Sequence, residues 1–151
     1  MIRKTIVAAG FAALAITLVP APALSVEICA EEGSTLRLDV SFDAWFEHGV
    51  IVQRMIDGAR VYSFNNHYGR GAGGEWNAGA GSWTSGRLAQ TTCYQVLGFH
   101  KPGPANPNLR WQPSRVQVFG NTIGFEDSDD NDFNDAAVRV DTIGPPPIIT
   151  P

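Results

Sequence analysis

The chain has 151 residues, of which 17% are charged and 44% are hydrophobic, with 16 Gly and 10 Pro. This composition is typical of one globular domain and excludes a disordered or fibrous chain. The formal net charge is -4 and there is no run of Lys or Arg, which argues against a nucleic-acid partner and against an anionic membrane surface.

Residues 1–25 have the pattern of a secretory signal peptide. Two basic residues precede an apolar run over 5–19, and small residues follow at Ala23 and Ser25. We predict cleavage after Ser25, with cleavage after Ala23 as the alternative. The run has about 15 residues, fewer than the roughly 20 that cross a bilayer, so we expect no membrane insertion and a secreted or periplasmic mature protein.

The mature part contains two cysteines, Cys29 and Cys93. An even pair in an oxidising compartment predicts one disulfide of long span. Two buried free thiols are the alternative, because the sequence does not say whether the two Cβ atoms face one another.

The first half of the mature chain has strand patterns. Apolar and polar residues alternate over 36–41, which is typical of a strand with one solvated face. A second extended run over 50–56 leads into Asp57-Gly58, a dipeptide favoured in type I′ turns, and 60–64 returns as the next strand. We therefore predict a β-hairpin closed by a type I′ turn.

Residues 68–86 are rich in glycine and carry Trp76 and Trp83. Their composition predicts a long loop or a glycine-rich strand pair. The two indoles would either stack on the apolar face of a sugar ring or cap the core, and both interpretations stay open. We expect Trp45 and Trp111 to pack.

The second half of the mature chain continues the same pattern. Strands are predicted at 91–100, 115–119 and 136–141, with a loop over 101–113 and a frayed proline-rich tail over 144–151. The pattern predicts an all-β antiparallel β-sandwich of about seven to nine short strands. This domain would span residues 26–143.

Residues 126–135 hold six of the 15 acidic residues of the chain. Carboxylates this close repel one another unless a cation lies among them, and oxygen ligands without His or Cys favour Ca²⁺ over zinc. An EF-hand is excluded, because a loop starting at Asp130 would have Asp135 where the sharp turn needs glycine. A solvated acidic loop is the alternative, although Phe125 and Phe133 favour an ordered one.

The segment GFEDSDDNDFNDAAVRV, residues 124–140, resembles the calcium loop of the bacterial calcium-mediated lectins that bind fucose and mannose. The shared pattern is Gly-x-Glu-Asp, a short spacer, Asp-Asn-Asp-aromatic-Asn-Asp-Ala and a valine-rich strand. The segment is also similar to a calcium-binding loop in domains of secreted adhesins.

The resemblance implies a site of one or two calcium ions whose metals are coordinated by sugar hydroxyls. One ion would be held by Glu126, Asp130, Asp132 and Asp135, and a second by Asp132, Asn134 and Asp135. The sugar would bind at the same loop, at Asp127, Asp130, Asp132, Asn134 and Asp135. Asp127 would accept a sugar hydroxyl.

The chain departs from the lectin pattern in two places. The family supplies an Asn from an earlier loop, where this chain has residues 41–48 with Asp43 as the nearest substitute. The family also takes a ligand from the C-terminal carboxylate of a partner subunit, whereas this chain continues past Gly144 into three prolines. One calcium or two, and a homodimer or not, therefore stay open.

No catalytic site is predicted. The histidines His48, His67 and His100 have no Glu or Cys at metal-ligand spacing, and nothing places a second carboxylate opposite Glu47 or Glu75 as in a glycosidase. We predict a secreted, calcium-dependent protein that binds carbohydrate on glycoconjugates. The alternative is a calcium-stabilised structural or adhesin module that binds protein or matrix without recognising sugar.

Overall fold

The computed structural model describes residues 24–44, 46–66, 77–103, 108–127 and 131–151. These residues form eleven strands and no helix, which confirms the predicted all-β fold. The strands are β1 (Ser25–Ala30), β2 (Thr35–Ala44), β3 (His48–Arg54), β4 (Arg60–Asn65), β5 (Asn77–Arg87), β6 (Thr92–His100), β7 (Gln112–Pro113), β8 (Arg115–Phe119), β9 (Thr122–Glu126), β10 (Ala136–Ile143) and β11 (Ile148–Thr150). Within these ranges no helix has the length and hydropathy of a membrane span.

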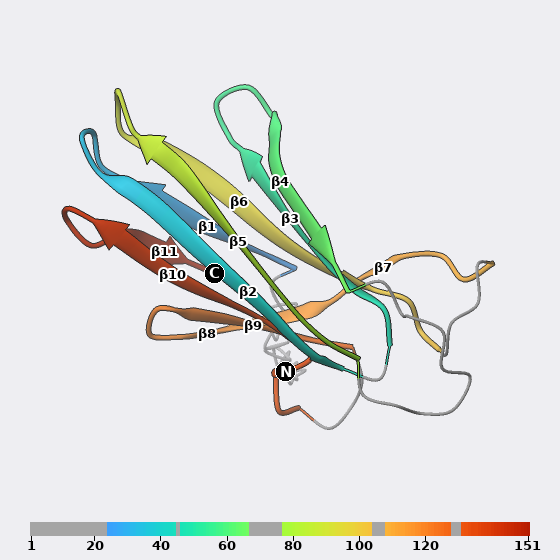
Figure 1. The fold of residues 1–151 in the computed structure, drawn as a ribbon. Helices are drawn as coiled ribbons and strands as arrows, with labels where there is room; N and C mark the ends of the chain where they lie inside the picture. The colour runs from blue at the N-terminus through green and yellow to red at the C-terminus, as the bar shows by residue number, and fades with distance from the viewer. Residues whose placement is uncertain (1–23, 45, 67–76, 104–107, 128–130) are drawn as a thin grey trace, which may run out of the picture.

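The strands make two antiparallel sheets that pack as a sandwich (Figure 1). Sheet A has the order β11-β1-β6-β3-β4, and β7 pairs with the end of β6 at Phe99 and His100. Sheet B has the order β5-β2-β10-β9-β8. All pairings within both sheets are antiparallel, as the alternating sequence pattern predicts.

The core lies between the two sheets and follows the period of two along each strand. In β2 every second residue is buried, and the residues between them are partly or fully exposed to solvent. In β6 buried and partly exposed residues alternate in the same way. The fully or nearly fully buried apolar side chains include Val26, Ile28, Leu36, Leu38, Val40, Phe42, Val50, Val52, Val96, Ile123, Phe125, Val138 and Val140. Burial of this apolar surface is the main driving force for pairing the sheets.

Several strand ends and the described part of the acidic segment gather at one end of the sandwich. Strands β2, β4, β6 and β9 end there, and β3, β5 and β10 begin there, because neighbouring strands are antiparallel. Backbone hydrogen bonds join these segments: the Asp43 N–H donates to the Asp135 carbonyl at 3.1 Å, and the Lys101 N–H to the Glu47 carbonyl at 2.9 Å. We call this the loop end, defined by residues 43–44, 46–48, 65–66, 100–103, 126–127 and 131–136.

The predicted hairpin between β3 and β4 is confirmed, but the prediction of a type I′ turn is wrong. The Arg54 N–H donates to the Ala59 carbonyl at 2.8 Å, which encloses four residues instead of two, and only Gly58 has a positive φ, 68°. The Asp57 carboxylate explains the longer turn, since it pairs with Arg54 and accepts the Ala59 N–H at 3.1 Å.

The glycine-rich region, which was predicted as a long loop or a strand pair, and the proline-rich tail both contribute strands. The described part of the glycine-rich region belongs to β5, which pairs with β2 along its length and so fits the strand interpretation. The prediction of a frayed tail is wrong for Ile148–Thr150, which pair with β1 as an edge strand. Short edge strands such as β7 and β11 raise the number of strands above the predicted range, because two or three residues are too few to show a period.

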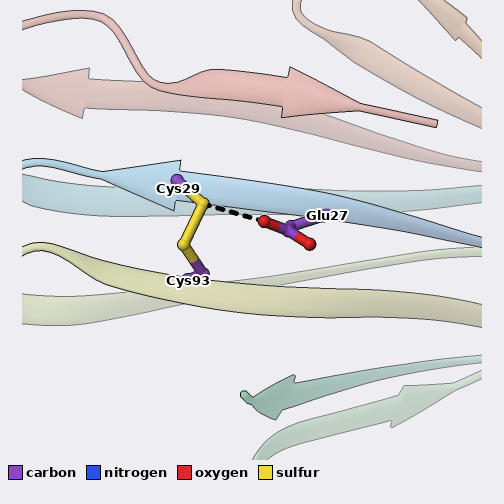
Figure 2. Close-up of side chains that lie close together, drawn as sticks. All are labelled: Glu27, Cys29 and Cys93. Carbon is purple, nitrogen blue, oxygen red and sulfur yellow. Dashed lines mark hydrogen bonds between the residues drawn. A yellow bond between two sulfur atoms is a disulfide. The ribbon is translucent and has the colours of Figure 1, made fainter. Parts of the chain in front are cut away.

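A disulfide joins Cys29 in β1 to Cys93 in β6, as predicted (Figure 2). The two residues lie directly opposite one another in the antiparallel register. Glu27 lies two residues before Cys29, and its Oε1 is 3.1 Å from the Cys29 sulfur. A disulfide sulfur carries neither a proton nor a thiolate charge, so this group of Glu27 and two cysteines is not a metal site.

Opening the disulfide should destabilise the fold. The bridge spans 64 residues of sequence, so breaking it frees a long loop in the unfolded chain, and the free energy of unfolding should fall by about 2 to 4 kcal/mol. The measurement is urea denaturation of the parent and of the double variant Cys29→Ala/Cys93→Ala. Equal unfolding midpoints would contradict a stabilising bridge.

Gly98 in β6 should not tolerate a methyl group. A Cβ at this position would lie 2.2 Å from Cδ1 of Phe125, whose side chain is fully buried in sheet B. Gly98→Ala should therefore cost about 1 to 3 kcal/mol of stability through overpacking. The matched control is Gly49→Ala in neighbouring β3, where the nearest atoms would be 3.6 Å away and the change should be close to neutral. Equal costs for the two variants would refute the close packing.

Candidate functional site

The acidic segment lies at the loop end, between the last residue of β9 and the first residue of β10. Glu126 ends β9, Ala136 begins β10, and Asp127 and residues 131–135 are the described part of the loop between them. Asp130, one of the predicted calcium ligands, lies outside the described residues.

Two carboxylates of this loop are buried. Glu126 is 1% exposed and Asp135 is 8% exposed. The Phe133 N–H donates to Glu126 Oε2 at 3.0 Å, and the Asp127 N–H donates to Asp135 Oδ2 at 2.9 Å. The loop backbone thus folds back on the two acids. Each carboxylate accepts a hydrogen bond from a backbone N–H that lies seven or eight positions away in the sequence.

The buried acids cannot all be ionised without a compensating charge. The pKa of Asp135 is raised to about 8, first by burial and then by the neighbouring Glu126 and Asp127, against the lowering effect of the Asp127 N–H. Three acidic side chains therefore gather where water screens them poorly. Either protons or a cation must balance them.

The outer part of the loop presents oxygen atoms to solvent. Asp132 and Asn134 are exposed, and Asp132 accepts the Asn134 side-chain amide at 2.7 Å and the Asn134 N–H at 3.2 Å. Asn131 and Phe133 have positive φ values of 62° and 53°, a conformation that asparagine adopts readily but that is costly for phenylalanine. The loop therefore holds a strained backbone just beside these oxygens.

Gly124 and Phe133 fix the position of the strained backbone. A Cβ on Gly124 would lie 2.3 Å from the Phe133 carbonyl oxygen, so the loop can approach β9 this closely only over a glycine. The Phe133 ring packs edge-on against Phe119 at 6.4 Å, and the Arg115 guanidinium lies 5.6 Å from its centre. Arg115 also donates to Asn131 Oδ1 at 2.6 Å.

His48 belongs to the site, although the sequence did not indicate it. Its side chain is fully buried at the start of β3, and Nε2 lies 2.7 Å from Asp127 Oδ2, where the ring N–H donates to the carboxylate. The Asp127 side chain is only 5% exposed. Asn66 Oδ1 accepts the His48 backbone N–H at 2.6 Å. The pair joins the start of the acidic loop to sheet A, and a contact over 79 residues leaves no local sequence signal.

His100 extends this buried polar group. Its Nδ1 lies 3.0 Å from the Ser114 hydroxyl, and its ring centre is 6.0 Å from that of His48. Burial lowers the pKa of His100, and His48 lowers it further, against the raising effect of Asp127 and Glu126. The sequence assigned no site role to either histidine, and their packing beside the acidic loop is a finding of the tertiary structure.

The tryptophans divide into three groups. Trp45 and Trp76 lie outside the described residues. Trp83 in β5 is partly buried and contacts Tyr94 edge-on at 5.4 Å, which fits the interpretation that it caps the core. Trp111 was expected to pack but is 41% exposed, because it lies over the outer face of sheet A.

The donor atoms of the loop fit calcium. The described candidates Glu126, Asp127, Asp132, Asn134 and Asp135 supply oxygen atoms from carboxylates and an amide, which is the ligand chemistry that calcium takes. Single ligand atoms of His48, Asp127 and Asp135 lie within 4.8 Å of one another, so the carboxylates are close enough to share a cation. His48 is the one nitrogen ligand in this group of three, and its Nε2 is already hydrogen-bonded to the Asp127 carboxylate.

Comparison with known proteins gives distant structural matches only. No family model and no curated protein matches the chain. The structure is similar to the Chromobacterium violaceum lectin CV2L, solved with alpha-methyl-fucoside, at 20% identity and a TM-score of 0.36, over 74% of this chain and 96% of that one. It is also similar to the high-affinity mannose-binding lectin of Ralstonia solanacearum, at 17% identity and a TM-score of 0.41, over 76% and 92%. Likeness at this level assigns neither a family nor a ligand to this chain.

His100 should make the folded protein sensitive to acid. Because its pKa is lowered on folding, the unfolded chain takes up this proton first, so the stability is fully present above about pH 6.5 and is lost as the pH falls through the folded pKa. His100→Gln retains a polar partner for Ser114 but cannot take up the proton. Urea denaturation at about pH 7.5 and about pH 5 should give a smaller loss for the variant than for the parent. Parallel losses in the two proteins would show that His100 does not contribute.

Proposed function

We propose that this chain is an exported, calcium-dependent carbohydrate-binding protein. The observation that carries the proposal is the burial of Glu126 and Asp135 side by side at the loop end, with Asp127 beside them. Buried carboxylates of this density call for a cation, and their oxygen chemistry favours calcium. The disulfide between Cys29 and Cys93 supports an oxidising compartment outside the cytoplasm.

Calcium would be held by the inner and outer acids of the loop together. Glu126 and Asp135 would form the buried side of the site, and Asp132 and Asn134 the exposed side, with Asp130 from the remaining segment. Bound calcium would supply open coordination positions that sugar hydroxyl pairs can take from water. The exposed position of Asp132 and Asn134 supports a ligand that arrives from solvent.

The residues around the loop prepare it for binding. Glu126 and Asp135 accept the N–H groups of Phe133 and Asp127, so the loop backbone is ordered by its own acids. His48 orients Asp127 and excludes water from that side of the loop. A loop that is already ordered loses less conformational entropy when it binds.

The sugar contact of Asp127 stays a prediction from the lectin resemblance. Its carboxylate now faces His48 and is buried, which supports a role in holding the loop against sheet A. The buried pair also favours the second candidate function, a calcium-stabilised module in which the metal only stiffens the loop. Neither function assigns a catalytic residue, and the homodimer also stays a prediction.

Calcium should stabilise the protein through this loop. A ligand that binds only the folded state at about 100 times its dissociation constant adds roughly 2.7 kcal/mol to the free energy of unfolding. The melting temperature should therefore rise in calcium relative to EDTA, and magnesium should have less effect because it requires stricter geometry. Identical melting curves in calcium and EDTA would exclude the metal site.

Asp132→Asn should remove most of the calcium effect, because it takes a charge from the exposed side of the site. The matched control is Asp141→Asn in β10, where the carboxylate pairs with Arg139 outside the loop and calcium stabilisation should persist. Calcium titration by calorimetry compares the two variants with the parent. If both variants bind calcium as the parent does, the loop is not the binding site.

A glycan array run in calcium and in EDTA separates the two candidate functions. A carbohydrate-binding protein should bind at least one glycan in calcium and lose that binding in EDTA and in Asp132→Asn. A protein that is stabilised by calcium but binds no glycan in either condition would instead support the calcium-stabilised module.

A further inference from the structure

A second candidate site lies on the outer face of sheet A. Strands β3, β4 and β6 and the segment before β7 enclose a hollow of about 310 Å³. It is lined on one side by the apolar Ile51, Phe99 and Trp111 and on the other by the polar Arg60, Ser63 and Asn65. None of these residues belongs to the acidic loop.

Gly49 creates the floor of this hollow. In the register of the sheet, Gly49 lies between Asn65 of β4 and Phe99 of β6, so the row across the three strands lacks a side chain at its centre. The edge of the Trp111 ring lies over this position, 3.6 Å from where a Gly49 Cβ would stand, so Gly49 itself is buried and the hollow opens beside the ring. The hollow thus follows from the pairing register, which places a glycine between Asn65 and Phe99.

Trp111 is held in place while much of its ring stays open. The Lys101 ammonium lies 5.0 Å from the ring centre and is itself paired with Glu47 at 2.7 Å. These contacts fix the indole, and it remains 41% exposed at the wall of the hollow. An exposed indole that is already ordered loses little conformational entropy when it binds a ligand.

The polar side of the hollow offers hydrogen-bonding groups. Arg60, Ser63 and Asn65 contribute a guanidinium, a hydroxyl and an amide to its lining. The other large hollow, of about 600 Å³ on the outer face of sheet B, differs: it has no aromatic wall, and its Asp39 and Arg139 are already in ion pairs.

We infer that the hollow over Gly49 is a calcium-independent site for a pyranose ring. A pyranose has an apolar C–H face that stacks on an indole and hydroxyls at its rim that accept and donate hydrogen bonds, so it complements a wall of Trp111 and Phe99 facing Arg60, Ser63 and Asn65. The volume is within the range of small-ligand sites. The site goes beyond the calcium loop, since it uses no residue of that loop.

The test is a nuclear magnetic resonance titration in EDTA with methyl glycosides of glucose, galactose and mannose and with their short oligosaccharides. The indole N–H of Trp111 and the amide of Asn65 should shift and saturate with at least one of these probes. Trp111→Ala should weaken that binding at least tenfold, measured at the Asn65 amide. The control Ile56→Ala removes an even more exposed apolar side chain, at the β3–β4 turn outside the hollow, and should bind as the parent does.

Each outcome of the titration supports or overturns the site. No saturable shift with any probe, or unchanged binding in Trp111→Ala, would overturn it. Binding that occurs only in calcium and disappears in Asp132→Asn would also overturn it, while supporting the calcium loop. Binding in EDTA that survives Asp132→Asn but not Trp111→Ala would support this site even if the calcium loop binds no sugar.

Discussion

The repulsion among buried carboxylates at the loop end is the constraint around which the rest of the site is organised. Glu126 and Asp135 are buried away from water. Asp127 follows Glu126 in the sequence, and its N–H donates to the Asp135 carboxylate. Such a group is stable only when hydrogen-bond donors and a compensating charge surround it. Backbone N–H groups supply the donors, and under the proposed function calcium would supply the charge.

The antiparallel sandwich makes this arrangement possible because it brings distant segments to one end. Sheet B delivers the acids at the end of β9 and the start of β10, and sheet A delivers His48 at the start of β3. The disulfide between Cys29 and Cys93 ties β1 to β6, the central strand of sheet A that neighbours β3. A rigid scaffold of this kind allows a strained loop to persist.

Glycines at three strand positions make room for different neighbouring groups. Gly98 and Gly124 permit close approach, one of the Phe125 ring inside the core and the other of the Phe133 carbonyl in the acidic loop. Gly49 instead leaves room for the edge of the Trp111 ring, which covers it and stands at the wall of the hollow. Close packing stabilises the first pair of positions, whereas the third lets an aromatic ring settle on the outer face of sheet A beside a hollow of ligand size.

The sequence by itself predicted most of the longer strands, favoured the disulfide and located the acidic oxygen-rich loop, because alternation, cysteine parity and charge density are local properties. Only the tertiary structure decided that Asp127 pairs with His48, that the tail adds an edge strand, and that Trp111 lies on the outer face of a sheet. These depend on contacts between residues far apart in the chain, as in the 79 residues between His48 and Asp127. The period of a strand says which residues share a face, but not which distant strand or loop that face meets.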